Sequence, residues 1–185
     1  MKRLLDMIAA AAGLVVALPV IVVFSVLIRK QSGASGIFAQ DRVGKNERVF
    51  RCYKLRTMRQ DTPDLPTHMA GSASVTPIGK FLRRYKVDEL PQLWNVVKGE
   101  MSLVGPRPCL LNQTELREER RSRGVFDVRP GITGLAQIEG IDMSEPARLA
   151  EKDAEYVQRQ TLASDLAIIV RTIIGGEGRG DRVRP

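Results

Sequence analysis

The chain begins with a long apolar segment and continues as shorter segments whose apolar residues alternate or recur at helical spacing. Residues 7–28 carry no charged side chain. A straight helix of that length would be about 33 Å long, close to the hydrocarbon thickness of a bilayer. The pattern predicts an N-terminal membrane segment followed by a domain of mixed secondary structure.

Three interpretations of the membrane segment are open. It could be a cleaved signal peptide with a basic N-terminal end, or a helix that spans the membrane once. It could also be a re-entrant helix, which enters the membrane, bends and leaves on the face by which it entered. Lys2, Arg3, Arg29 and Lys30 would then all lie on the cytoplasmic side, which basic residues favour. Pro19 favours a bend because it lacks an N–H group and clashes with the preceding turn. These residues leave the spanning and re-entrant forms both open.

The remainder of the chain predicts a β-hairpin and several helices. Residues 37–43 and 48–58 flank a Gly-Lys-Asn-Glu turn and read as its two strands. Thr76 and Pro77 mark a helix start, since threonine is a favoured N-cap and proline is tolerated in the first turn. Further helices are expected at 88–99, 109–124, 145–160 and 164–174, the last capped by Ser164 or Asp165, with a strand or turn at 101–108 and mostly loop at 60–74 and 128–140.

Charge narrows the choice of partner. The chain has 185 residues and a formal net charge of +8 at pH 7, so we expect an anionic partner: nucleic acid, phospholipid or a phosphorylated substrate. No nucleic-acid-binding motif is apparent, and aromatic residues make up only 5% of the chain, so we expect no nucleic acid partner. Cys52, Cys109 and His68 are too scattered to predict a disulfide framework or a zinc site.

Two adjacent carboxylates, Asp88 and Glu89, follow a basic stretch and have two interpretations. Aspartate is a favoured helix N-cap, glutamate suits a first turn, and Pro91 is tolerated there, so the pair could simply begin a helix. Alternatively, the pair could hold Mg²⁺ together with substrate phosphates, and an aspartate can be the nucleophile of phosphoryl transfer.

The basic residues around this pair favour chemistry. Lys54, Arg83, Arg107 and Arg129 are candidate phosphate-binding residues. Arg107 lies between two prolines and Arg129 precedes another, and rigidly held guanidinium groups suit bidentate recognition of phosphate. The charged run at 116–123 is expected to be a solvated surface. A non-catalytic, membrane-anchored basic module that binds anionic lipid or a partner protein would also fit this composition.

Three segments carry a resemblance to a known family. YKLRTM (53–58), VDELPQLWNVVKGEMSLVGPRP (87–108) and RPGITGLAQ (129–137) resemble, in the same order, motifs of the bacterial monotopic phosphoglycosyl transferases. These enzymes begin glycan assembly on a polyprenyl phosphate carrier. The resemblance covers nearly the whole chain, which is close to the family's minimal catalytic core.

The resemblance implies a reaction and the residues that perform it. Members transfer a phosphosugar from a nucleotide diphosphate sugar, commonly UDP-linked, to undecaprenyl phosphate, using Mg²⁺ and a ping-pong mechanism. By this match Asp88 forms a phosphosugar-aspartate intermediate, Glu89 supports the metal, and both are expected metal ligands. The other matching site positions are basic at Lys54, Arg83 and Arg107 and acidic at Asp165.

The resemblance also implies how the chain meets the membrane. Residues 1–30 would form a re-entrant membrane helix, with Pro19 matching the proline of the bend and Leu18 replacing a serine. The cytoplasmic face of the bacterial inner membrane is the expected location. The expected partners are a nucleotide sugar, polyprenyl phosphate and membrane phospholipid, and a homo-oligomer stays open.

The expected fold class is therefore α+β. Residues 31–175 would form one cytosolic, interfacial catalytic domain, with a small β-hairpin and several amphipathic interfacial helices, and residues 176–185 a disordered tail. Ile141 occupies a position where some members carry an arginine linked to the nucleotide sugar, which makes it a candidate determinant of donor choice.

Overall fold

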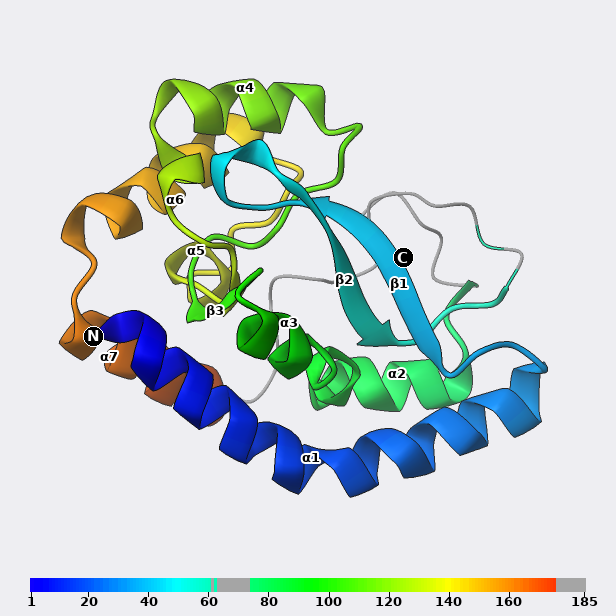
Figure 1. Cartoon of the computed structure of the whole chain (residues 1–185). Coiled ribbons are helices and arrows are strands. Elements are labelled where there is room, and N and C mark those ends of the chain that lie inside the picture. Colours follow the sequence, from blue (N-terminus) through cyan, green and yellow to red (C-terminus); the bar gives the residue numbers. More distant parts are fainter. Residues whose placement is uncertain (61, 63–73, 176–185) are drawn as a thin grey trace.

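A single long helix, α1 (Lys2–Ser32), lies along one side of the molecule, and the other elements lie on its concave side (Figure 1). The computed structural model describes residues 1–60, 62 and 74–175. Most of the predicted loop at 60–74 and the predicted tail at 176–185 therefore lie outside the described residues. The mixture of helices and short strands confirms the α+β class.

The long helix continues through Pro19 and bows near its middle (Figure 1). In the described part of the chain, α1 is the helix whose length and apolar composition would allow it to cross a membrane. Most of its apolar side chains are exposed. The buried residues of α1 recur at helical spacing and form one face toward the domain: the apolar Ala10, Ala17, Ile21 and Ile28, with the charged Asp6.

The predicted hairpin is confirmed. Strands β1 (Ile37–Val43) and β2 (Val49–Leu55) pair antiparallel, with a 3₁₀ turn, η1 (Lys45–Glu47), between them. Alternation along β2 buries Phe50 and Cys52 against α1 and α3 (Gln92–Lys98). This packing brings the end of β2 close to the residues that precede α3.

A second, parallel pair of strands was only half predicted. β3 (Ser102–Val104) lies where a strand or turn was expected, but β4 (Gly131–Thr133) and the short helix α5 (Leu135–Ile138) lie in a segment predicted to be mostly loop. A three-residue strand has no periodicity to detect, and β4 exists because β3 supplies its hydrogen bonds. A side-chain carbon at Gly131 would lie only 2.1 Å from the backbone nitrogen of Gly105, so this contact requires glycine.

The remaining helices largely follow the predictions. α2 (Pro77–Arg84) is capped by Thr76, whose hydroxyl accepts a hydrogen bond from the Gly79 N–H, and α4 (Thr114–Ser122) and α6 (Pro146–Arg159) form as expected. The cap predicted for α7 (Leu162–Ile174) is wrong. Thr161 and Ser164 form a capping box that starts this helix earlier, so Asp165 lies inside its first turn.

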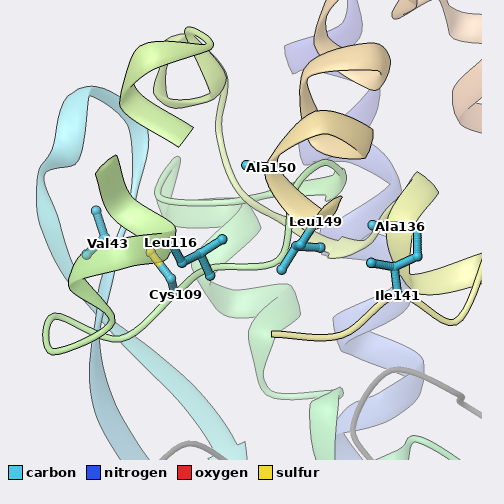
Figure 2. Packing of buried hydrophobic residues seen from close by; sticks show 7 residues of the cluster. All are labelled: Val43, Cys109, Leu116, Ala136, Ile141, Leu149 and Ala150. Atoms are coloured by element: carbon cyan, nitrogen blue, oxygen red, sulfur yellow. The ribbon is translucent and has the colours of Figure 1, made fainter. Parts of the chain in front are cut away.

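The core beneath β1, α4, α5 and α6 is a small apolar cluster (Figure 2). Its buried members come from these elements and the segments beside them: Val43, Cys109, Leu116, Ala136, Ile141, Leu149 and Ala150. Ile141 is thus a core residue, 5% exposed. The expectation that 116–123 is a solvated surface is wrong for Leu116 and Arg120, each 1% exposed, because this face of α4 packs on α6.

Candidate active site around Asp88 and Glu89

Asp88 and Glu89 lie on a 3₁₀ turn, η4 (Val87–Glu89), between α2 and α3. The turn follows Lys86, which has the left-handed φ of 55°. α3 begins only at Gln92, and neither η4 nor α3 has a side-chain cap hydrogen bond. The interpretation of Asp88 as a helix N-cap is therefore wrong. Both carboxylates are nonetheless buried, Asp88 at 6% and Glu89 at 8% exposure.

Glu89 is held by two basic residues from distant segments. Its Oε1 lies 3.4 Å from Nζ of Lys54, on β2, and accepts a hydrogen bond from Nη2 of Arg107 at 2.8 Å. Arg107 follows β3. The structure thus brings two of the four predicted phosphate-binding residues to the predicted dyad, where these side chains are largely buried and little solvent screens their charges.

Arg83 approaches the same region from α2. Its Nε donates to the hydroxyl of Thr57 at 2.9 Å, just beyond β2. Its Nη1 is buried and has no hydrogen-bond partner among the described residues. A buried guanidinium N–H without an acceptor is costly, so such a group is well suited to an anionic ligand.

Arg129 lies elsewhere. Its Nε donates to the carbonyl of Gly99, the C-cap of α3, at 2.8 Å. Arg3 donates from Nη1 to the carbonyl of Val96 at 2.7 Å. Both arginines complement the partial negative charge at the C-terminus of α3. This is the end of α3 opposite to the one that follows the dyad.

Asp165 is held at the start of α1. It accepts hydrogen bonds from Nζ of Lys2 at 2.6 Å and from the hydroxyl of Tyr156 at 2.7 Å. In the same network Asp6 accepts a hydrogen bond from Ser102 at 2.7 Å. Within the part of the chain that the structure describes, Asp165 makes no hydrogen bond or ion pair with the dyad. Its contacts fasten α7 and α6 to the first turn of α1.

Sequence reasoning missed Asn95, which joins α3 to β2. It is fully buried, and its Oδ1 accepts a hydrogen bond from the Tyr53 N–H at 3.1 Å, while its Nδ2 donates to the Arg51 carbonyl at 2.6 Å. These contacts end one residue before Lys54 and fix its approach to Glu89. The signal in the sequence that could have found Asn95 was a polar residue within the apolar stretch of a predicted helix.

The carboxylates fit a divalent cation only in part. In the described residues no group of three or more His, Cys, Asp or Glu side chains could enclose a metal. Two adjacent carboxylates among basic residues match the usual Mg²⁺ arrangement, in which one or two carboxylates act together with substrate phosphates and water. The donor set therefore suits a cation that arrives with a phosphorylated substrate.

Comparison with known proteins places the chain in a family. A family model described as "Bacterial sugar transferase" matches residues 1–176. A "UDP-glucose:undecaprenyl-phosphate glucose-1-phosphate transferase" of Caulobacter vibrioides is 38% identical over 93% of this chain and 68% of its own length. An "Exopolysaccharide production protein ExoY" of Rhizobium meliloti is 36% identical over 93% of this chain and 83% of its own length.

Some relatives are much longer. A "Galactosyl transferase CpsE" of Streptococcus agalactiae is 38% identical over 93% of this chain, yet the match spans only 41% of that protein. Each of these matches covers 93% of this chain, in short and long relatives alike. The chain therefore belongs to the bacterial sugar transferase family.

Proposed function

We propose that the chain transfers a sugar phosphate from a nucleotide diphosphate sugar, UDP-linked, to a polyprenyl phosphate and releases the nucleoside monophosphate. The observation that carries the proposal is the buried Glu89, bound by Lys54 and Arg107 beside Asp88. Asp88, 6% exposed, lies on the same turn next to these charges, and an aspartate can act as the nucleophile of phosphoryl transfer.

In the first step a carboxylate oxygen of Asp88 attacks the β-phosphorus of the donor. The bond from this phosphorus to the oxygen that bridges the two phosphates breaks, and the nucleoside monophosphate leaves with that oxygen. A phosphosugar-aspartate remains. Arg83 and Arg107 would neutralise charge on the transferred phosphate, which is the main contribution of a protein to phosphoryl transfer.

In the second step a phosphate oxygen of the polyprenyl carrier attacks the same phosphorus. The bond to Asp88 breaks, the carboxylate is regenerated, and a polyprenyl diphosphate sugar is the product. Asp88 and Glu89 would hold Mg²⁺ together with the donor phosphates, and the cation would supply further neutralisation of phosphate charge. Arg129 stays a weaker candidate for phosphate binding because its Nε is engaged at the C-terminus of α3.

The contacts of α1 support a re-entrant arrangement. Its first turns are fastened to the domain through Lys2 and Asp6, and its far end packs through Ile28 against Leu55 and Leu82. A helix whose two ends contact one domain cannot place those ends on opposite sides of a membrane. We therefore propose that α1 enters and leaves on the cytoplasmic face, with its bow near Pro19 in the bilayer.

Neighbouring helices extend the apolar surface of α1. Phe81 of α2 packs on Phe24 of α1, with ring centroids 6.0 Å apart. Exposed apolar side chains continue along α2, α3 and α7, the helices beside α1 in Figure 1: Phe81, Tyr85, Trp94, Leu162, Leu166, Val170, Ile173 and Ile174. Such helices seat in phospholipid at the headgroup level, where a carrier phosphate and a soluble nucleotide sugar can both reach the dyad.

The test is UMP release from a panel of UDP-sugars by the reconstituted full chain with undecaprenyl phosphate and Mg²⁺. Exchange of labelled UMP into the UDP-sugar without carrier isolates the first step. Asp88→Asn should abolish both, whereas Asp41→Asn, in an exposed ion pair with Arg51, should change neither. Substantial exchange by Asp88→Asn would overturn the nucleophile assignment. Membrane binding without Mg²⁺-dependent release from any donor would favour a non-catalytic basic module.

A further inference from the structure

Arg120 is a buried charge with no direct part in the proposed reaction. It is 1% exposed and is the largest of the fully buried side chains among the described residues. Its Nε and Nη2 donate to Oδ2 of Asp153, on α6, at 3.0 and 2.7 Å, and Asp153 is itself 2% exposed. Apolar residues of similar volume often stabilise a core at least as well as a buried ion pair. Stability alone is thus a weak reason for the presence of Arg120 in the core.

A further contact of Arg120 leads to the candidate active site. Its Nη1 donates to the backbone oxygen of Arg107 at 2.8 Å. Arg107 is the residue whose guanidinium binds Glu89. The two flanking prolines have no N–H groups, so a regular backbone ladder cannot hold this segment.

The segment is held instead by its carbonyl oxygens. Four successive carbonyls each accept a hydrogen bond from β4, α4 or β1: Pro106 from the Gly131 N–H, Arg107 from Arg120, Pro108 from Nη1 of Arg42, and Cys109 from the Val43 N–H. The Arg107 carbonyl is the one of the four that a buried, ion-paired side chain holds. Its position therefore depends on how α4 and α6 pack.

We infer that Arg120, oriented by Asp153, is a positioning residue for Arg107 in the sugar phosphate transfer. It fixes the backbone from which the Arg107 side chain reaches Glu89 and the transferred phosphate. The inference rests on the proposed function, since it assumes that Arg107 acts at that phosphate. A displacement of about 1 Å at such a group can cost about 10²-fold in rate.

The first test removes both buried charges together, in a double variant that we call the charge-free pair. Arg120→Met with Asp153→Val leaves neither charge unpaired, so the double variant should fold with a Tm close to that of the native chain. We expect kcat for UMP release to fall about 10²-fold while the donor KM changes only a few-fold. Arg120→Lys keeps the positive charge but lacks the forked guanidinium group. Its kcat should lie between that of the native chain and that of the double variant.

A double-mutant cycle with Arg107→Gln distinguishes positioning from general damage. If Arg120 acts through Arg107, adding the charge-free pair to Arg107→Gln should cost little further activity. The loss of activity caused by Ala154→Gly, a buried change on the same helix as Asp153, should instead multiply with the loss caused by Arg107→Gln. Full multiplication by the charge-free pair would overturn the inference and leave the proposed reaction intact.

Hydrogen exchange supplies a readout that does not need activity. The amides of Gly105, Arg107 and Cys109 should exchange faster in the charge-free pair than in the native chain, with no such change in Ala154→Gly, a buried change on α6. If the native chain released no UMP, the proposed function would fail, and unchanged exchange of these amides would separately overturn the inferred contact.

Discussion

Glu89 shows at the residue scale how the site forms from sequence-distant groups. Lys54, Glu89 and Arg107 come from β2, η4 and the segment after β3, and all three were predicted from their chemistry and motif positions. Their distances were not predictable, because they depend on how β2 packs on α3. Arg83 belongs to the same region, whereas Arg129 and Asp165 lie in other networks.

Arg83 gives a prediction at this scale. Arg83→Met removes a buried N–H that has no partner among the described residues, along with one hydrogen bond to Thr57. These effects on stability oppose each other, so the free energy of unfolding should change by less than about 1 kcal/mol. The value of kcat/KM for UMP release should nevertheless fall about 10²-fold.

The neighbouring arginine is the matched control. Arg84→Met alters an exposed residue in the same turn of α2, and it should leave kcat/KM near the native value. Equal losses for the two variants would indicate damage to α2 rather than loss of a phosphate contact.

At the scale of elements, two contacts decide where the hairpin and α1 sit. The turn of the hairpin is joined to α4 by Glu47, which accepts hydrogen bonds from Arg121 at 2.6 Å and Arg117 at 3.1 Å. The first turn of α1 is joined to α6 and α7 by the network of Lys2, Tyr156 and Asp165. Local patterns predicted each element but neither contact.

The Glu47 contact predicts a pH dependence. The hydrogen bond from Arg121, followed by that from Arg117, lowers the pKa of Glu47 to about 2. Because the folded pKa lies below the unfolded one, this carboxylate stabilises the fold above about pH 4.5, and the contribution is lost as the pH falls toward about 2. Glu47→Gln should therefore lower the Tm at about pH 7 and have no effect near pH 2.

The effect should be small, because these side chains are partly exposed and solvent screens them. Glu115→Gln, an exposed change on α4, is the control and should show no pH-dependent difference. A Tm difference for Glu47→Gln that stayed constant across this pH range would contradict the assignment.

The network around Asp165 predicts a loss of docking. Asp165→Asn leaves the ammonium group of Lys2 with a weaker partner and should lower the free energy of unfolding by about 1–3 kcal/mol. Hydrogen exchange should increase in the first two turns of α1, and activity should fall in proportion to the docked fraction.

The exposed Asp41 is again a suitable control, since Asp41→Asn removes one ion pair without affecting α1. If Asp165→Asn kept its stability and its protected α1 yet lost kcat, Asp165 would have a role at the active site instead.

At the scale of the whole molecule, the proposed contact with a membrane depends on α1. This helix underlies the domain from end to end (Figure 1), and its outward faces are apolar. Its length and composition were evident from the sequence, but they fit a spanning helix equally well. Contacts at both of its ends are what favour the re-entrant form.

Cysteine labelling at the two ends of α1 tests this arrangement. One cysteine is placed ahead of Met1 and another at the exposed Gln31, while the buried Cys52 and Cys109 give little background. In inside-out and right-side-out vesicles, an impermeant reagent should reach both introduced cysteines from the cytoplasmic side. Labelling of the two ends from opposite sides would exclude the re-entrant form.

The sequence by itself determined the elements with clear periodicity and the chemical nature of the site. The apolar helix, the hairpin and the amphipathic helices follow from local hydrophobic patterns, and the adjacent carboxylates with their basic companions indicated the candidate site. These features need only residues that are close together in the chain.

Tertiary structure alone decided which charged groups meet. Asp88 is on a 3₁₀ turn rather than at a helix cap, β4 exists because β3 pairs with it, and Arg120 is buried within a run that reads as surface. For β4 and Arg120 the physical reason is the same. A buried polar group needs a partner, and here the partner comes from a segment tens of residues away, which no local pattern specifies.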